Sequence, residues 1–207
     1  MDKYDIKTAH KTLYSPGAKE FCLVDVPSLQ YISIDGHGDP NTSPVYADAI
    51  ESLYTVAYAV KFGTRKSLGR DFVVAPLEGL WRAEDMSSFT RRDKAAWDWS
   101  MMIAQPSWIT ADVIAAAREQ AAKKKHLTGL RDISLRTLSE GRSVQILHIG
   151  SYDDEAPTLH RLHTEYLADN GLTVNGDHHE IYLNDARRTA PAKLRTILRQ
   201  PVRLQPA

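Results

Sequence analysis

The chain has 207 residues, enough to bury the core of one large domain or of two small halves. Its 26 basic and 26 acidic residues cancel, which argues against a protein that binds nucleic acid or an anionic membrane through its overall charge. The sequence shows no membrane span and no secretory signal, and its single cysteine, Cys22, excludes an internal disulfide. We therefore expect a cytoplasmic protein that contacts neither nucleic acid nor membrane directly.

The first part of the chain alternates strand patterns with one long helix. Residues 1–20 are polar and aperiodic, so we expect an N-terminal arm there. Ser43 and Pro44 form a good N-cap and first turn, and apolar residues then recur at helical spacing to about Gly63. The strands of this part are expected over residues 21–26, 31–35, 71–77 and 95–104.

The second part repeats this alternation after a linker helix. Thr110 is expected to cap that helix, which reaches about Lys125. Pro157 opens another helix, and Asn170 and Gly171 stop it. Residues 133–138 and 144–149 are expected to form a hairpin around residues 140–142, followed by strands over residues 179–183 and 196–198.

The order of these elements occurs twice. A strand leads through a turn to a helix that begins near Pro44, and a second strand leads in the same way to Pro157. Each half closes on an apolar run that ends in Gln-Pro. We therefore predict an α+β fold of duplicated strand-helix-strand-strand modules, with antiparallel sheets around a central ligand cleft. The predicted domain is residues 21–207, with halves at about 21–108 and 131–204.

Three acidic residues are the candidates for chemistry, because they lie beside apolar or aromatic neighbours. They are Glu78, Glu155 and Glu180. In a strand, Glu180 shares one face with His178 and Tyr182, which suits a lined cavity. Burial among aromatic rings raises the pKa of a carboxyl group, so such a group can act as acid or base near neutral pH. The alternative is that each is a solvated surface residue, and that Glu155 only favours the helix start after it.

Aromatic side chains accompany these carboxylates. Trp97 is expected in a core stripe, whereas Trp81 or Trp99 at the end of a stripe could stack on a planar ligand. The histidines, which include the adjacent pair His178 and His179, lack a metal-binding pattern, and we expect neither a metal site nor a cofactor. The aromatic candidates together are Tyr54, Trp81, Trp97, Trp99, Tyr152 and Tyr182.

Several segments resemble the GyrI-like small-molecule-binding family. They are PLEGLW (76–81), MIAQP (102–106), IGSYDDEAP (149–157), HEIYLNDARR (179–188) and the tail KLRTILRQPV (193–202). The resemblance covers about residues 20–204 and implies two strand-helix-strand-strand modules around a cleft. Family members resemble a gyrase inhibitor and the effector domains of multidrug-responsive regulators. Because only about 20 residues precede the first strand here, we expect the domain without the regulators' DNA-binding segment.

The stand-alone branch of this family is similar to cyclopropanoid cyclopropyl hydrolases, which open the strained ring of DNA-alkylating natural products. The resemblance implies that Glu155 and Glu180 activate water and that Tyr152 or Tyr182 donates to the dienone oxygen. The implied partner is a hydrophobic planar small molecule, and the implied state is a monomer or homodimer. Two alternatives stay open: a module that binds or senses drugs without chemistry, and a protein that interacts with gyrase or a regulator. The residues that line the pocket are expected to be Tyr54, Glu78, Trp81, Trp99 and Tyr182.

Overall fold

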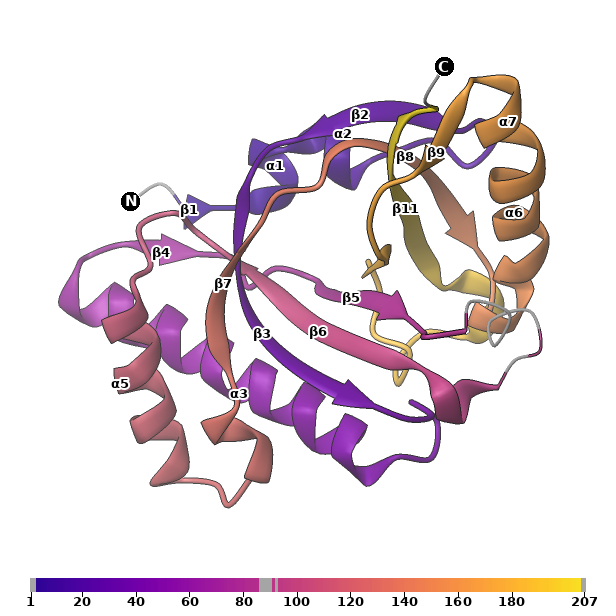
Figure 1. Cartoon of the computed structure of the whole chain (residues 1–207). Coiled ribbons are helices and arrows are strands. Elements are labelled where there is room, and N and C mark those ends of the chain that lie inside the picture. The colour runs from indigo at the N-terminus through magenta and orange to yellow at the C-terminus, as the bar shows by residue number, and fades with distance from the viewer. Residues whose placement is uncertain (1–2, 86–90, 92, 206–207) are drawn as a thin grey trace. The chain divides into compact units, whose positions relative to one another are not determined.

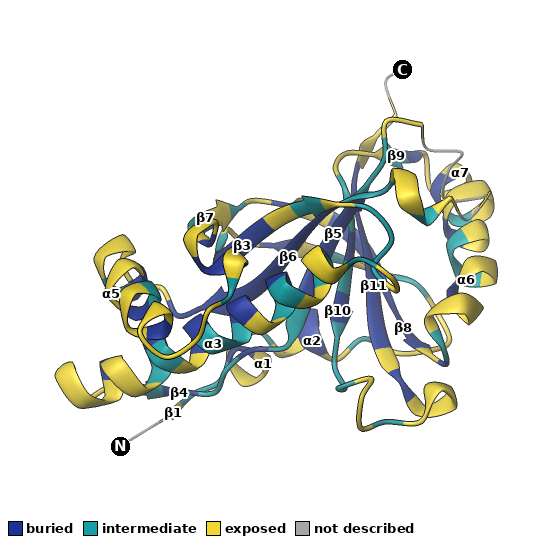
Figure 2. Cartoon of the chain, turned by 90° about the horizontal axis from the view of Figure 1, so that it is seen from below, coloured by how far each residue is buried: buried dark blue, intermediate teal, exposed yellow. Residues whose placement is uncertain are grey.

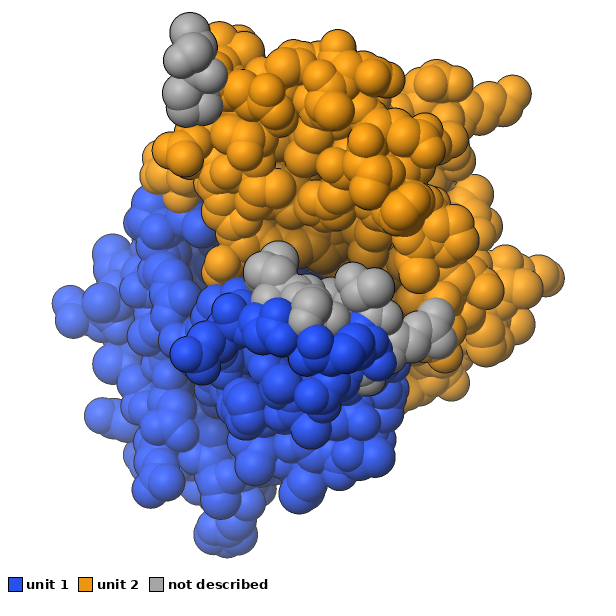
Figure 3. Space-filling model, turned by 45° about the vertical axis from the view of Figure 1, so that its right-hand side comes forward, with its two compact units in different colours: residues 1–9, 29–138 blue, residues 10–28, 139–207 orange. Residues whose placement is uncertain are grey.

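The computed structural model describes residues 3–85, 91 and 93–205, and it has the α+β fold that the sequence predicts. The chain divides into two compact units, which Figure 3 colours separately. Each unit has its own helices and its own set of antiparallel strand pairs. Unit 1 consists of residues 1–9 and 29–138, and unit 2 consists of residues 10–28 and 139–207.

Unit 1 contains a sheet and two long helices (Figure 1). Its elements are β1 (Lys3–Tyr4), α1 (Ile6–Ala9), β3 (Leu29–His37), α3 (Pro44–Ser67), β4 (Asp71–Phe72), β5 (Leu77–Arg82), η1 (Lys94–Ala96), β6 (Asp98–Gln105), α5 (Ala111–Ala122), η2 (Thr128–Arg131) and β7 (Ser134–Leu138). The sheet order is β5-β6-β3-β7 with all pairs antiparallel, while β1 and β4 form a separate parallel pair.

The long helix α3 begins and packs as its sequence predicts. Ser43 accepts a hydrogen bond on its side chain from the Tyr46 amide, and Pro44 opens the first turn. The face that carries Leu53 and Val56 is fully buried. This face packs on β3 and β6, and α5 lies beside the helix (Figure 1). Figure 2 shows the buried strands in dark blue and the exposed outer surfaces of the helices in yellow.

Unit 2 is built on antiparallel strands that one helical segment covers. Its elements are α2 (Lys11–Tyr14), β2 (Cys22–Val26), β8 (Gly141–Ile149), η3 (Tyr152–Glu155), α6 (Ala156–Arg161), η4 (Leu162–Tyr166), α7 (Leu167–Asp169), β9 (Leu172–Val174), β10 (His178–Tyr182), η5 (Pro191–Lys193) and β11 (Arg195–Leu204). The strand order is β2-β8-β11-β10, and β9 pairs with the far end of β11. The segment α6-η4-α7 packs one apolar face on this sheet, in a cluster of Val144, Leu162, Leu167, Leu172 and Val202.

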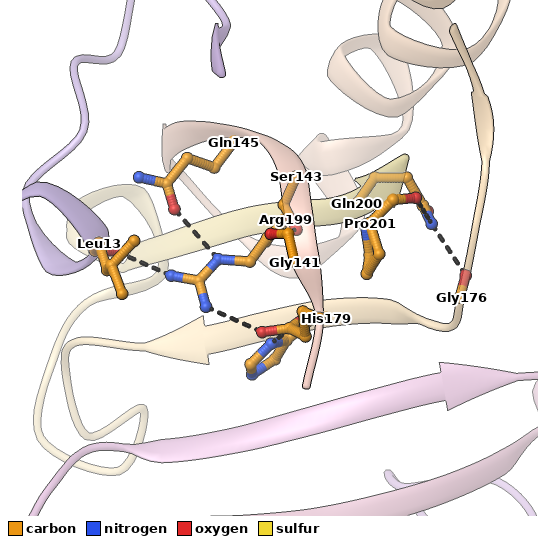
Figure 4. Close-up of polar contacts among 10 residues, drawn as sticks. Leu13, Gly141, Ser143, Gln145, Gly176, His179, Arg199, Gln200 and Pro201 are labelled. Atoms are coloured by element: carbon orange, nitrogen blue, oxygen red, sulfur yellow. Dashed lines mark hydrogen bonds and ion pairs between the residues drawn. The ribbon is translucent and has the colours of Figure 1, made fainter. Parts of the chain in front are cut away.

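The opposite face of this sheet holds a buried ion network (Figure 4). Arg199 on β11 and His179 on β10 are fully buried, and Glu140 lies between them. Arg199 donates to Glu140 at 3.2 Å and to the Leu13 carbonyl at 2.9 Å, and His179 Nδ1 lies 2.9 Å from Glu140. Gln145 accepts a further bond from Arg199 at 3.1 Å. Every one of these partners belongs to unit 2.

The structure corrects the predicted N-terminal arm. Residues 3–14 include a short strand and two one-turn helices, and Ile6, Leu13 and Tyr14 are buried. The helices α1 and α2 have four residues each, too few to show a helical period in the sequence. The Leu13 carbonyl also binds Arg199, so this segment is a structural part of unit 2 from residue 10 onward.

The predicted hairpin around residues 140–142 is wrong. Strand β7 pairs with β3, while β8 pairs with β2. The two strands therefore belong to different units, and the boundaries differ from the halves expected at 21–108 and 131–204. Glu140 favours this arrangement, because it is buried beside Arg199 and His179 and is not part of a solvated turn.

Two predicted strands also change their extent. The run at residues 71–77 splits into β4 and β5, since Pro76 has no amide hydrogen for a ladder. The last strand is longer than predicted and continues through Pro201. That proline pairs with Ser143 of β8, and its carbonyl accepts from the Asn175 amide where the strand passes from β8 to β9.

No helix in the described part of the chain is long and apolar enough to cross a membrane.

Candidate functional site

The centre of the candidate site is the Glu180 carboxylate on β10. Tyr182 lies two residues further on the same strand face, and its hydroxyl donates to Glu180 Oε2 at 2.8 Å. His178 lies two residues before, with Nε2 3.6 Å from Glu180 Oε1. The Glu180 side chain is 15% exposed, so the carboxylate is largely shielded from water. The alternation of β10 thus brings an imidazole, a carboxylate and a phenol onto one face, as the sequence predicts.

Two neighbouring strands extend this face. Thr196 on β11 pairs with Tyr182, and His148 on β8 pairs with Thr196. Directly paired residues point to the same face of a sheet, so these side chains lie beside the Glu180 group. His148 Nε2 lies 3.0 Å from the Ser151 carbonyl oxygen. A carbonyl only accepts, so this nitrogen carries the hydrogen.

A tight turn after β8 presents the other predicted residues. Gly150 has φ +151°, a conformation that other residues rarely adopt, and a Cβ there would lie 2.9 Å from His148 Nε2. Ser151 donates through its hydroxyl to Asp154 at 2.6 Å, and the Asp154 amide donates back to the Ser151 carbonyl. These bonds shape the turn η3, which carries Tyr152 and Glu155.

The turn η3 brings Tyr152 into contact with β10. The Tyr152 ring lies 5.6 Å from the Tyr182 ring in an edge-to-face arrangement. Tyr152 is 41% exposed, whereas Glu155 is only 4% exposed. The structure therefore joins Tyr152, Tyr182 and Glu180 directly and buries Glu155 in the same turn as Tyr152.

The helical segment above this face contributes a histidine that sequence reasoning missed. Residues 162–166 form a π-helical turn, and such turns are frequent at functional sites. His163 lies in this turn. Partial desolvation and the nearby charge of His178 both lower the pKa of His163, although part of its surface is exposed. The three histidines 148, 163 and 178 therefore belong to the surroundings of the site. In the sequence, only His178 is linked to the site by a pattern, which is its alternation with Glu180.

The described residues contain no group of three or more His, Cys, Asp or Glu side chains arranged to hold a metal ion.

The candidate residues of unit 1 lie on two faces of its sheet. Trp81 and Trp99 form a cross-strand pair on the α3 side, and Tyr46 of α3 contacts the Trp99 ring edge-to-face at 5.1 Å. Trp99 has no exposed surface, and Trp81 is 6% exposed. Glu78 occupies an odd offset from Trp81 in β5 and therefore points to the opposite face. Tyr54 is half-buried on α3.

These positions limit what the unit 1 residues can do. Trp99 lies in the core beneath α3, and Glu78 is fully buried as well. Both side chains are shielded from solvent in this structure. The assignment of Tyr54, Glu78, Trp81 and Trp99 to ligand contacts stays a prediction.

Comparison with known proteins identifies relatives over nearly the whole chain. A family model described as the GyrI-like small molecule binding domain matches residues 19–203. An uncharacterized conserved protein from Listeria innocua is 36% identical, with a TM-score of 0.88 over 97% of this chain and 100% of that chain. Two structures of hydrolases from Listeria innocua are each 34% identical, with TM-scores of 0.84 and 0.87 over 97% and 98% of this chain and 100% of theirs. Comparison with curated protein sequences finds no match at the significance required.

Proposed function

Because the chain belongs to the GyrI-like small-molecule-binding family, we propose that it binds planar aromatic or cationic small molecules and hydrolyses the cyclopropane ring of DNA-alkylating natural products. The observation that carries this proposal is the shielded Glu180 carboxylate, hydrogen-bonded to Tyr182, with the Tyr152 ring against Tyr182. The hydrolase relatives from Listeria innocua support a hydrolytic reaction. The function would be detoxification.

The proposed reaction adds one water molecule to the strained ring. The water oxygen bonds to the cyclopropane methylene carbon, and the carbon–carbon bond to the spiro centre breaks. Its electron pair enters the dienone, which becomes a phenolate and then takes a proton to give a phenol. The water proton passes to a carboxylate, and the phenolate takes a proton from a donor on the enzyme. The enzyme returns to its starting state when the carboxylate releases its proton to solvent and the donor regains one from solvent. No oxidant or cofactor is needed.

The roles of the two glutamates follow from their surroundings. Glu180 Oε2 already accepts the Tyr182 hydroxyl, so Oε1 is the oxygen assigned to orient and deprotonate water. Glu155 is assigned to the same water, because it is buried in the turn that contacts β10 through Tyr152. Because both carboxylates are shielded from bulk solvent, the bound ligand is protected from side reactions with other water molecules.

Tyr152 is assigned the role of proton donor to the dienone oxygen. The Tyr182 hydroxyl donates to Glu180, whereas Tyr152 is partly exposed and its ring packs against the Tyr182 ring. A donor placed where negative charge develops stabilises the transition state. In this scheme Tyr182 instead fixes the orientation of the carboxylate.

Turnover of a duocarmycin-type cyclopropane, followed by mass spectrometry, tests this proposal. We expect more than one ring-opened product molecule per chain from excess substrate. Glu155→Gln and Glu180→Gln should each lower kcat by about 10²- to 10⁴-fold, the contribution of a positioned acid or base. The matched control is Glu165→Gln, which changes an exposed glutamate in the π-helical turn of residues 162–166 and should keep the wild-type rate.

Two outcomes would contradict the assignment. Wild-type rates in both glutamate variants would show that these carboxylates are not the catalytic groups. Protection that saturates at one ligand per chain, with no product released, would favour the alternative of a binding module without chemistry.

A further inference from the structure

The strand face that carries Glu180 also carries a buried hydroxyl without a hydrogen-bond partner. Thr196 is 1% exposed, and its Oγ1 has no partner among the residues that the structure describes. It lies directly across from Tyr182 on one side and from His148 on the other. Buried polar atoms are nearly always paired in folded proteins, so an unpaired hydroxyl at this position requires an explanation.

A second group on the same face has the same property. The His178 side chain is 12% exposed, and neither ring nitrogen has a hydrogen-bond partner within the described ranges. Its Nε2 atom lies 3.6 Å from Glu180 Oε1, which is beyond hydrogen-bond distance. A neutral imidazole has one donor and one acceptor nitrogen, and a hydroxyl can serve as either. Together, Thr196 and His178 flank the Glu180–Tyr182 pair with unused hydrogen-bonding capacity.

The opposite face of the same sheet shows a different arrangement. There Arg199 bonds to Glu140, Gln145 and the Leu13 carbonyl, and Gln145 also donates to the carbonyl of Thr12. Arg199 thus uses its donors within unit 2, whereas Thr196 Oγ1 and the His178 nitrogens, on the face of the candidate site, have no partner among the described residues.

We propose that Thr196 and His178 bind polar groups of the ligand. The site then prefers flat aromatic molecules that carry a carbonyl acceptor and an N–H or O–H donor, and it binds aromatic molecules without these groups less well. This inference rests on the proposed function and names the substrate class of the same site. A site built to hydrogen-bond a ligand rejects analogues that lack the polar group, because its own buried groups then stay unpaired.

Thr196→Val provides a sharp test, since valine has nearly the shape of threonine and lacks only the hydroxyl. If the hydroxyl serves the ligand, its loss should leave the thermal midpoint unchanged or raise it, because an unpaired buried hydroxyl is removed. The same change should weaken binding of the ring-opened phenol product about tenfold, the effect of about one hydrogen bond. Binding of tetraphenylphosphonium, an aromatic cation without a hydrogen-bonding atom, should stay the same.

Three further variants complete the experiment. Thr196→Ser retains the hydroxyl and should restore the affinity for the phenol. His178→Phe retains a ring without nitrogens and should show the same selective loss. Thr173→Val changes a threonine of β9 in the same sheet, outside the Glu180 face, and should change neither affinity. Isothermal titration calorimetry with the two named ligands measures all of these effects.

The results separate this inference from the proposed function. If Thr196→Val lowers the thermal midpoint and leaves both affinities unchanged, the hydroxyl is structural and the inference is overturned. Equal weakening for both ligands would also overturn it, since no selectivity would then depend on the hydroxyl. If the wild-type protein binds neither the phenol nor the intact cyclopropane, the proposed function is wrong, and this inference is wrong as well because it rests on that function.

Discussion

Replacing Glu140 by glutamine tests the buried ion network of unit 2. Glu140 is 7% exposed and bonds to both Arg199 and His179. The substitution keeps the shape of the side chain but removes its charge. Arg199 then stays fully buried without a counter-charge, and breaking a buried pair in this way costs about 3–5 kcal/mol.

The lowered pKa of Glu140 leads to an expectation of similar size. Burial alone raises this pKa, but the charge and hydrogen bond of His179, and then those of Arg199, outweigh burial and lower the pKa from 4.5 to about 2. The difference of 4.5 − 2, at 1.36 kcal/mol per unit, corresponds to about 3 kcal/mol. Since the pKa is lowered on folding, this stabilisation is present above pH 4.5 and is lost as the pH falls from 4.5 to about 2.

Urea unfolding followed by circular dichroism between pH 2 and 8 measures both expectations. The free energy of unfolding of Glu140→Gln should be about 3–5 kcal/mol lower at pH 7, and its decrease between pH 4.5 and 2 should be flatter than in the wild type. The control is Glu51→Gln, which breaks an exposed ion pair to Lys125 and should cost less than about 1 kcal/mol. If Glu140→Gln does not fold, Glu140→Gln combined with Arg199→Met should recover most of the loss.

The reasoning is refuted if Glu140→Gln loses less than about 1 kcal/mol and keeps the wild-type dependence on pH. In that case the charge of Arg199 would be satisfied by its neutral partners alone.

Two glycine substitutions test close packing. Gly36→Ala should lower the free energy of unfolding by about 1–3 kcal/mol, because a Cβ at this position overlaps the Trp99 ring. The control is Gly17→Ala, which places a Cβ in open space and should have little effect. Equal effects of the two substitutions in thermal unfolding would contradict this prediction. Gly150→Ala should cost about 1–3 kcal/mol, because φ is +151° and the new Cβ meets His148. It should also lower turnover of the cyclopropane substrate, since this turn carries two of the predicted site residues, and an unchanged kcat would count against that role.

Local signals in the sequence predicted much of the fold. Ser43 and Thr110 cap their helices as expected, because a capping side chain needs only the amides two or three residues ahead. The alternation of β10 also placed Glu180 and Tyr182 on one face, since a strand has a period of two. Both inferences depend on residues that are close in the chain.

Pairings between distant residues could not be predicted in this way. The β2 strand pairs with β8 and β7 pairs with β3, across more than 100 residues, and no turn signal encodes such contacts. Arg199 lies in a polar-looking tail, yet it is fully buried because its partners come from residues 13, 140 and 145. The position of Thr196 could not be predicted either, since only the register of β11 with β10 places it beside Tyr182.

The two adjacent histidines of β10 show how one strand separates stability from chemistry. His179 faces Glu140 and is committed to the ion network, whereas His178 faces Glu180 and keeps its nitrogens for other partners. A slip of one residue in this strand would place Glu180 beside Glu140, two carboxylates in a buried site, and would turn Tyr182 away from the candidate site. The ion network therefore opposes the wrong register, and the presentation of the Glu180 carboxylate on one face depends on charges paired on the other.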